Sequence, residues 1–259
     1  MLEIYKILGV NCLVNALVLT RLHMHGVKQG DRQLTILGMA IAVLFFLVTR
    51  GKPLSSLSSK RPPASVLCKP ALLSIALQFL VHFAAIETVT EISLKFVDPY
   101  DPSIIPDASF NPNVLNSCTF LLTMLATINT FAINYRGRPY MQNLRENKML
   151  YRSLQLCYAV LLICTLEVFP PLNDLFQLTE FPSTQMGISD DNSGVGVGIE
   201  NSSSFVDDND DWIRSINEST GVVGLVKDIG FPLAMTGLMI MDTIAAFACE
   251  KIIVRVFDV

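Results

Sequence analysis

Residues 34–49 read LTILGMAIAVLFFLVT and contain no charged side chain. A helix that crosses a bilayer needs about 20 mostly apolar residues, because lipid offers no hydrogen-bond partner to an exposed backbone. This stretch reaches that length when the flanking Arg32 and Arg50 extend their charged ends to opposite interfaces. The apolar run is continuous rather than alternating, which favours a helix over a barrel strand. We therefore predict a transmembrane helix here.

Five further stretches have the same apolar character and a similar length. They are residues 4–22, 71–92, 114–135, 154–172 and 231–254. The stretch 154–172 is the least typical, because Glu167 lies inside it and Pro170-Pro171 ends it. We predict an all-α fold, a polytopic transmembrane helix bundle of six spans.

The composition of the whole chain agrees with this prediction. Hydrophobic residues make up 51% of the 259 positions and charged residues only 16%, against about 25% charged in a typical soluble domain. Such a chain cannot cover a soluble core with a solvated surface. The formal net charge of −4 leaves no basic face for nucleic acid. The composition therefore excludes a soluble enzyme and a nucleic-acid binder, and it makes the lipid bilayer the expected partner.

The distribution of Lys and Arg predicts the orientation. Segments 50–69 and 136–152 carry five each and the C-terminal tail two, whereas the opposite connections carry six together. Cytosolic loops of membrane proteins carry the excess of Lys and Arg. We therefore expect these segments and both termini in the cytosol, and the 170–230 loop in the lumen.

The loop before the last span has its own composition. Residues 187–211 are rich in Gly, Ser, Asn and Asp, which predicts disorder because little apolar surface is available to offset the ordering entropy. Two N-glycosylation sequons begin at Asn201 and Asn217, on the side that the charges place in the lumen. We divide the chain into residues 1–186 with five spans, an acidic disordered loop 187–229, and residues 230–259 with the sixth span and a short tail.

Polar side chains inside the first span are candidate functional residues. Asn11 and Asn15 lie four positions apart and therefore on one helix face. Polar groups in a membrane often mark function, but these amides could instead only bond a neighbouring helix. Glu3 and Lys6, three positions apart, could pair with each other at the membrane surface.

Ionisable groups occur in three other spans. Glu87 and Glu91 follow His82 near the lumenal end of the third span, where we expect them to reach water. Glu167 and Asp242 are single carboxylates in the fifth and sixth spans. Asp242 is deep enough in an apolar helix that we expect a buried partner or a bound proton.

We find no catalytic residue and no metal-ligand set in the sequence. His23-Met24-His25 has no third ligand nearby, and neither a zinc-ligand spacing nor a Gly-rich phosphate loop is present.

Four segments are specific enough to compare with a known family. They are YKILGVNCLVNALVL at 5–19, VTRGKPLSSLSSKRP at 48–62, TFAINYRGRPY at 130–140 with RENK at 145–148, and FPPLNDLFQL at 169–178. Together these resemble the C-terminal membrane region, spans five to ten, of type V P-type ATPases of the A subgroup, which reside in the endoplasmic reticulum. The resemblance covers all six spans and fails in the acidic loop.

The resemblance implies a function for a longer protein. Such an ATPase extracts mistargeted transmembrane helices from the reticulum membrane with ATP and magnesium, which are bound by cytosolic domains that carry DKTGT and TGES. Neither motif occurs here, so we expect a fragment that lacks the preceding spans and the ATPase domains and is inactive alone. No cofactor is expected in the chain itself.

The resemblance also implies a substrate groove in the first two spans. Its candidates are Asn11, Asn15, Asp31 and Thr35, a set that suits a peptide groove better than a cation site, although Asp31 could merely cap the following helix. Two alternatives remain open, a segment of a cation pump of the manganese-transporting kind and a stand-alone membrane scaffold or carrier.

Overall fold

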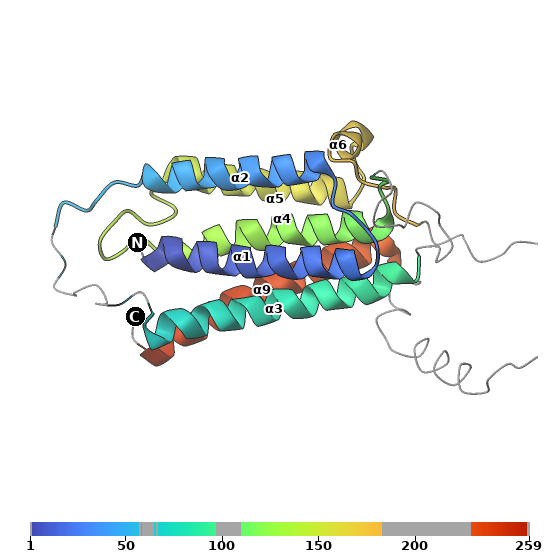
Figure 1. Ribbon diagram of the computed structural model, residues 1–259. Coiled ribbons are helices and arrows are strands. Elements are labelled where there is room, and N and C mark those ends of the chain that lie inside the picture. The colour runs from blue at the N-terminus through green and yellow to red at the C-terminus, as the bar shows by residue number, and fades with distance from the viewer. Residues whose placement is uncertain are drawn as a thin grey trace, which may run out of the picture. The chain divides into compact units, whose positions relative to one another are not determined.

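The computed structural model of the protein describes residues 2–56, 58, 65, 67–96, 110–182 and 229–257. These residues form helices and contain no strand. In chain order the helices are α1 (Leu2–Met24), α2 (Asp31–Thr49), α3 (Lys69–Leu94), α4 (Val114–Asn134), α5 (Lys148–Thr165), α6 (Pro170–Leu175) and α9 (Phe231–Phe257) (Figure 1). The predicted all-α class is confirmed. The predicted disorder of 187–211 and the sequons at Asn201 and Asn217 lie outside the described residues.

The chain forms two compact units. One comprises Met1–Glu180 with Met235–Val259, and the other comprises Phe181–Ala234. In the second unit the rings of Phe181 and Phe231 lie 5.0 Å apart, centroid to centroid. The features that follow all belong to the first unit.

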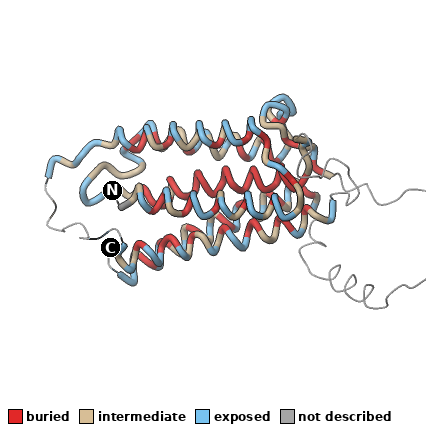
Figure 2. The backbone as a smooth tube through the Cα atoms, viewed as in Figure 1, coloured by how far each residue is buried: buried red, intermediate tan, exposed pale blue. Residues whose placement is uncertain are grey.

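Helix α4 is the centre of the first unit. All residues in the most apolar 18-residue stretch of α4 are buried, whereas 33%, 28% and 39% of the residues in the corresponding stretches of α1, α2 and α3 are buried (Figure 2). Helices α1, α2, α3 and α5 pack against it. The exposed faces of the outer helices carry large apolar side chains, such as Leu8, Met39, Phe46 and Leu80. This arrangement suits a lipid environment, with apolar side chains outside and polar ones gathered within.

Among the described residues, four helices, α1 to α4, are long and apolar enough to cross a membrane. They correspond to the first four predicted stretches, and α9 corresponds to the sixth. The passage of α5 and α9 through the membrane stays a prediction.

The fifth predicted stretch, 154–172, is not one helix. Phe169 leaves the helical region, with φ −133° and ψ 87°, because the proline ring of Pro170 disfavours a helical conformation in the preceding residue. Glu167 has a φ of 53°, and the N–H groups of Glu167 and Val168 donate to carbonyls of the last turn of α5 at 3.2 and 3.1 Å, which is a Schellman motif. Glu167 therefore lies half-buried in the turn that closes α5, and its predicted position inside a membrane helix is wrong.

Two loops meet at the end of the bundle where α1 begins and α9 ends (Figure 1). The loop after α2 pairs with the loop between α4 and α5, since Leu54 N donates to Tyr140 O at 3.1 Å and Gln142 N to Lys52 O at 3.0 Å. These loops belong to the two segments that we expect in the cytosol. Their meeting at one end agrees with that topology, and the side of the membrane stays a prediction.

An internal ion pair supports the loop between α4 and α5. Arg138 Nη2 donates to Glu146 Oε1 at 2.5 Å, and Asn143 N donates to Glu146 Oε2 at 2.9 Å. These two donors, the backbone N–H first, hold the pKa of the Glu146 carboxyl below its ordinary value. Hydrogen bonds within the loop between α4 and α5 therefore hold it in a defined conformation.

Gly137 provides a test of the paired loops. Its φ is +71°, and a Cβ atom at this position would lie 1.8 Å from the carbonyl oxygen of Gln142. A left-handed conformation costs an alanine about 1–2 kcal/mol before any clash. We expect Gly137→Ala to lower the thermal unfolding midpoint in detergent micelles by about 4 °C or more. Gly38→Ala on α2, where a Cβ meets nothing within 4 Å, is the matched control and should cause no loss; equal midpoints for the two variants would contradict the loop geometry.

Candidate functional site in the polar interior of the bundle

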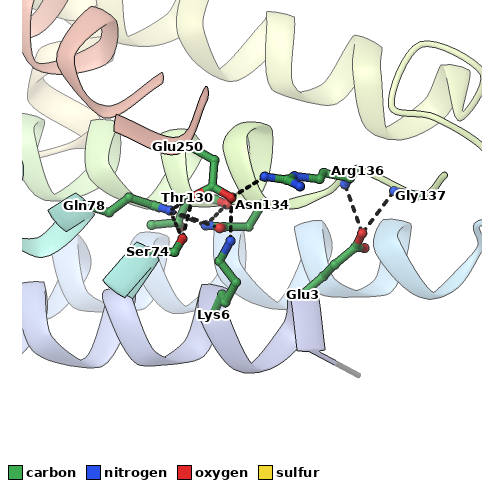
Figure 3. A network of polar contacts seen from close by, with 9 residues as sticks. All are labelled: Glu3, Lys6, Ser74, Gln78, Thr130, Asn134, Arg136, Gly137 and Glu250. Atoms are coloured by element: carbon green, nitrogen blue, oxygen red, sulfur yellow. Dashed lines mark hydrogen bonds and ion pairs between the residues drawn. The ribbon is translucent and has the colours of Figure 1, made fainter. Parts of the chain in front are cut away.

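A buried carboxylate joins four parts of the chain. Glu250 of α9 is 5% exposed, and its Oε1 accepts from Lys6 Nζ of α1 at 2.6 Å and from Arg136 Nη2 after α4 at 2.7 Å. Its Oε2 accepts from Ser74 Oγ and, at 3.2 Å, from Gln78 Nε2, both on α3 (Figure 3). We call these five residues the Glu250 cluster. Both carboxylate oxygens are therefore fully used by groups of the protein.

Two neighbouring residues, Asn134 and Glu3, form further hydrogen bonds with members of the Glu250 cluster. Gln78 and Asn134 of α4 exchange two amide hydrogen bonds, of 3.1 and 2.9 Å. Glu3 accepts from the backbone N–H groups of Arg136 and Gly137 at 3.2 and 3.1 Å (Figure 3). Lys6 thus pairs with Glu250 and not with Glu3, which was the alternative raised by their spacing. Two carboxylates, Glu3 and Glu250, thus lie together with the cations Lys6 and Arg136, and their formal charges balance.

A second polar cluster lies between α3, α4, α5 and α9. His82 Nδ1 lies 2.9 and 3.0 Å from the two carboxylate oxygens of Asp242, and both side chains are 1% exposed. Asn129 of α4 donates to Asp242 Oδ2 at 3.2 Å and accepts from the Tyr158 hydroxyl at 2.7 Å. Asn129 also bonds Thr243 of α9. We call these five residues the His82 cluster.

Two further links lie toward the other end of the bundle. Gln33 of α2 donates to Asn116 Oδ1 of α4 at 2.8 Å, and Asn116 donates to the carbonyl of Lys28 at 2.9 Å. Arg21 of α1 forms a two-pronged ion pair with Glu87 of α3. Polar side chains thus join α2 to α4 and α1 to α3, two pairs of helices that also pack against each other.

The groove candidates in the first two spans do not share one environment. Asn11 is 5% exposed and donates to Thr130 Oγ1 of α4 at 3.0 Å, whereas Asn15 is half-buried. Asp31 and Thr35 are exposed, and the Thr35 hydroxyl donates to the Asp31 carbonyl at 2.8 Å. Asp31 is the first residue of α2, and Gly30 is its N-cap. The bond of Asn11 to α4 is the alternative that its position left open, a bond to a neighbouring helix. Contact of Asn15, Asp31 and Thr35 with a substrate stays a prediction.

The structure shows the surroundings of the ionisable side chains in the spans. Asp242, for which we expect a buried partner or a bound proton, is 4% exposed and lies against the buried His82. Of the two carboxylates that we expect to reach water, Glu91 is exposed and Glu87 is half-buried. Glu250 lies within the predicted sixth span but was not singled out, although a second carboxylate in an apolar stretch is itself a signal. The three asparagines of 114–135 gave the same signal and were also missed; they are Asn116, Asn129 and Asn134.

Comparison with known proteins identifies relatives of the chain. No protein-family model matches it. A probable manganese-transporting ATPase of Arabidopsis thaliana is 38% identical over 183 residues, which is 70% of this chain and 15% of the relative. Endoplasmic reticulum transmembrane helix translocases of Saccharomyces cerevisiae and Schizosaccharomyces pombe are each 36% identical, over 67% and 70% of this chain and 14% and 15% of the relatives.

The chain belongs to the type V P-type ATPase family. It spans only about 15% of the length of the curated relatives it matches. These matches agree with the resemblance to a C-terminal membrane region of such an ATPase. The Glu250 and His82 clusters thus belong to a membrane portion of this family.

The Glu250 cluster predicts that substitutions of Glu250 and Lys6 have non-additive effects on the free energy of unfolding. Glu250→Gln leaves Lys6, which is 9% exposed, as a buried cation without a counter-ion, and removing one partner of a buried ion pair costs about 3–5 kcal/mol. Lys6→Met with Glu250→Gln removes both charges, and Arg136, whose side chain is 31% exposed, can turn to solvent. We expect the double variant to be more stable than Glu250→Gln alone by about 1–3 kcal/mol.

Unfolding in mixed micelles measures the free energy of unfolding of the wild type, both single variants and the double variant. Purely additive losses would contradict the assignment of Lys6 as the partner of Glu250.

Proposed function

We propose that this chain is the membrane portion of an ATP-driven translocase of the endoplasmic reticulum that moves transmembrane helices. Two of the relatives described above carry this activity in their names. The names support a location in the endoplasmic reticulum, and the apolar helices α1 to α4 support a multi-pass membrane protein. Since the chain spans about 15% of these relatives, the activity would belong to a longer protein of which it forms a part.

The side chains available as metal ligands in the interior decide between a transmembrane helix and a cation as the transported substrate. A divalent cation such as manganese needs several oxygen or nitrogen ligands from the protein. In the described residues no three His, Cys, Asp or Glu side chains gather to hold a metal ion. The buried carboxylates also already have partners within the protein: Glu250 pairs with Lys6 and Arg136, and Asp242 lies within hydrogen-bond distance of His82. This interior supports helix translocation better than cation transport.

ATP and magnesium would act on a different part of such a translocase. The sequence contains neither DKTGT nor TGES, so its residues do not fit a nucleotide site. The chain would instead contribute the membrane path, with Asn15, Asp31 and Thr35 as groove candidates. The preceding spans and the cytosolic ATPase domains would be its partners, and a transmembrane helix would be its substrate.

A chimera tests the proposed function. This chain replaces the matching segment of the S. cerevisiae translocase, and the chimera is reconstituted in lipid vesicles. We expect ATP turnover that is stimulated by a single-span transmembrane peptide and removal of that peptide from the vesicle membrane. Turnover that responds to manganese with uptake of the ion, and not to the peptide, would favour the cation alternative and overturn the proposal.

Two variants of the chimera distinguish a role of an asparagine in the substrate groove from a role in helix packing. Asn15→Leu alters a half-buried groove candidate, and we expect it to reduce peptide stimulation. Asn11→Leu is the matched control on the same helix, because its amide is bonded to Thr130. It should cost about 0.6–2 kcal/mol of stability and leave the stimulation in place.

The orientation has its own test. Synthesis of the chain with microsomes should add glycans at Asn201 and Asn217 and protect the loop that carries them from external protease. An endoglycosidase would then increase the gel mobility of the chain, and Asn201→Gln with Asn217→Gln would abolish the shift. Cleavage of that loop from the outside would show that the topology is inverted.

A further inference from the structure

We infer that the junction between α2 and α5 binds an anionic phospholipid of the bilayer, with three cations for its headgroup and an apolar surface for its acyl chains. The cations are Arg50, at the end of α2, and Lys148 and Arg152, in the first two turns of α5. We call these three residues the basic junction. The inference concerns a lipid and not a transported substrate, and it does not depend on the proposed function.

The last turn of α2 and the first turn of α5 lie against each other. Asn147, the N-cap of α5, donates from Nδ2 to the carbonyl of Leu47 at 3.1 Å, and the two helices pack side by side (Figure 1). Arg50 follows Leu47 by three residues, and Lys148 follows Asn147 directly. Lys148 and Arg152 are four residues apart and therefore share one helix face. The fold thus gathers cations from two segments that are distant in the sequence.

The positive charge of the basic junction has no counter-ion in the described part of the chain. Its three residues are exposed, and none of them forms an ion pair with a described carboxylate. The Arg50 guanidinium lies 5.7 Å from the ring centroid of Phe46, a contact that positions the group without neutralising it. The acidic residue of the loop before α5, Glu146, already accepts from Arg138 and from the N–H group of Asn143. The basic junction therefore attracts an external anion.

Apolar side chains adjoin the basic junction on the side of the helix centres. Phe46, one turn before the end of α2, is 58% exposed, and Leu156, one turn after Arg152, is 65% exposed. Met149, in the first turn of α5, is 57% exposed. A phospholipid has the same division, because its charged headgroup lies at the interface and its acyl chains lie in the hydrocarbon core. A soluble anion would leave the apolar side chains unused, so this surface fits a lipid better.

The two ends of the bundle differ in charge. The end that carries the basic junction has further exposed cations on the paired loops, on α3 and on α9, and Glu146 is the only exposed acid among its described residues. At the opposite end the two signs are mixed, with exposed Asp31 beside Arg32 and exposed Glu91 four residues before Lys95. Basic clusters next to membrane helices attract anionic lipids. Such lipids should therefore gather in the leaflet at the first end, where the basic junction offers a defined place.

Binding of phosphatidylserine to the whole chain tests this inference. Native mass spectrometry of the chain in detergent micelles gives the dissociation constant of the first bound lipid, and phosphatidylcholine is the zwitterionic comparison. We expect phosphatidylserine to bind more tightly. Arg50→Gln, Lys148→Gln and Arg152→Gln together should weaken its binding by about tenfold or more, because each cation near the membrane surface contributes roughly a fivefold gain in affinity. A wild type without this preference, or a triple variant with unchanged binding, would overturn the inference.

The matched control removes three cations at the same end of the bundle but on other helices. Lys69→Gln, Lys251→Gln and Arg255→Gln change the net charge by the same amount, and these exposed residues belong to α3 and α9. We expect this variant to bind phosphatidylserine as tightly as the wild type. An equal loss in both triple variants would show attraction to the overall charge and not a site at the basic junction, which contradicts the inference.

A photoreactive phosphatidylserine maps the site in the wild type and does not depend on the folding of a variant. With the reactive group near the headgroup, we expect crosslinks within residues 46–52 and 145–156 in lipid bilayers, and they should persist in excess inorganic phosphate. Crosslinks confined to other helices, or their loss to phosphate, would remove the lipid from the basic junction. None of these experiments involves ATP or a transmembrane peptide, so failure here is distinct from failure of the proposed function.

Discussion

The carboxylate of Glu250 is the interaction on which the arrangement of the bundle depends. It accepts from α1, from α3 and from the residue that follows α4 by two positions, so four parts of the chain meet at one group. A carboxylate at this depth requires such a set, because lipid and apolar side chains provide no alternative partner. The contacts are mutually dependent: Lys6 and Arg136 need Glu250 as much as Glu250 needs them. Because these partners reach Glu250 from fixed positions on their helices, the shared carboxylate favours one register of the helices.

The same constraint explains why polar residues concentrate on α4. A helix that is surrounded on all sides in a membrane protein can carry asparagine only if its neighbours supply partners, whereas the hydroxyls of Thr119, Thr123 and Thr130 donate to carbonyls of α4 itself. Asn116, Asn129 and Asn134 are bonded to α2, α9 and α3 respectively. The central helix α4 therefore forms side-chain hydrogen bonds with several of the helices that surround it. Their remaining faces are left apolar for lipid.

The helices could be predicted from the sequence, but their pairings could not. Spans such as 34–49 and 114–135 follow from the local length and apolarity of a segment, and the observed α2 and α4 agree with them within a few residues. Lys6 and Glu250 are 244 positions apart, and no local pattern connects them. The broken fifth stretch had a local cause in Pro170-Pro171, and the error lay in continuing a helix through it. For the groove candidates, the spacing placed Asn11 and Asn15 on one helix face. It did not indicate that Asn11 forms a hydrogen bond with Thr130 of α4.

The position of the Glu250 cluster bears on how a membrane portion of this family could respond to its cytosolic domains. Glu3, near the start of α1, binds the backbone of the loop after α4, while Lys6, one turn later, binds α9 and through Glu250 also α3. A displacement of α1 along its axis would therefore act on both connections at once. Under the proposed function, α1 would be the helix that follows the domains that use ATP. The charges at its first two turns would then carry that motion to α9 and α3, while the exposed α2 residues Asp31 and Thr35, at the opposite end of the bundle, stay free to meet a substrate.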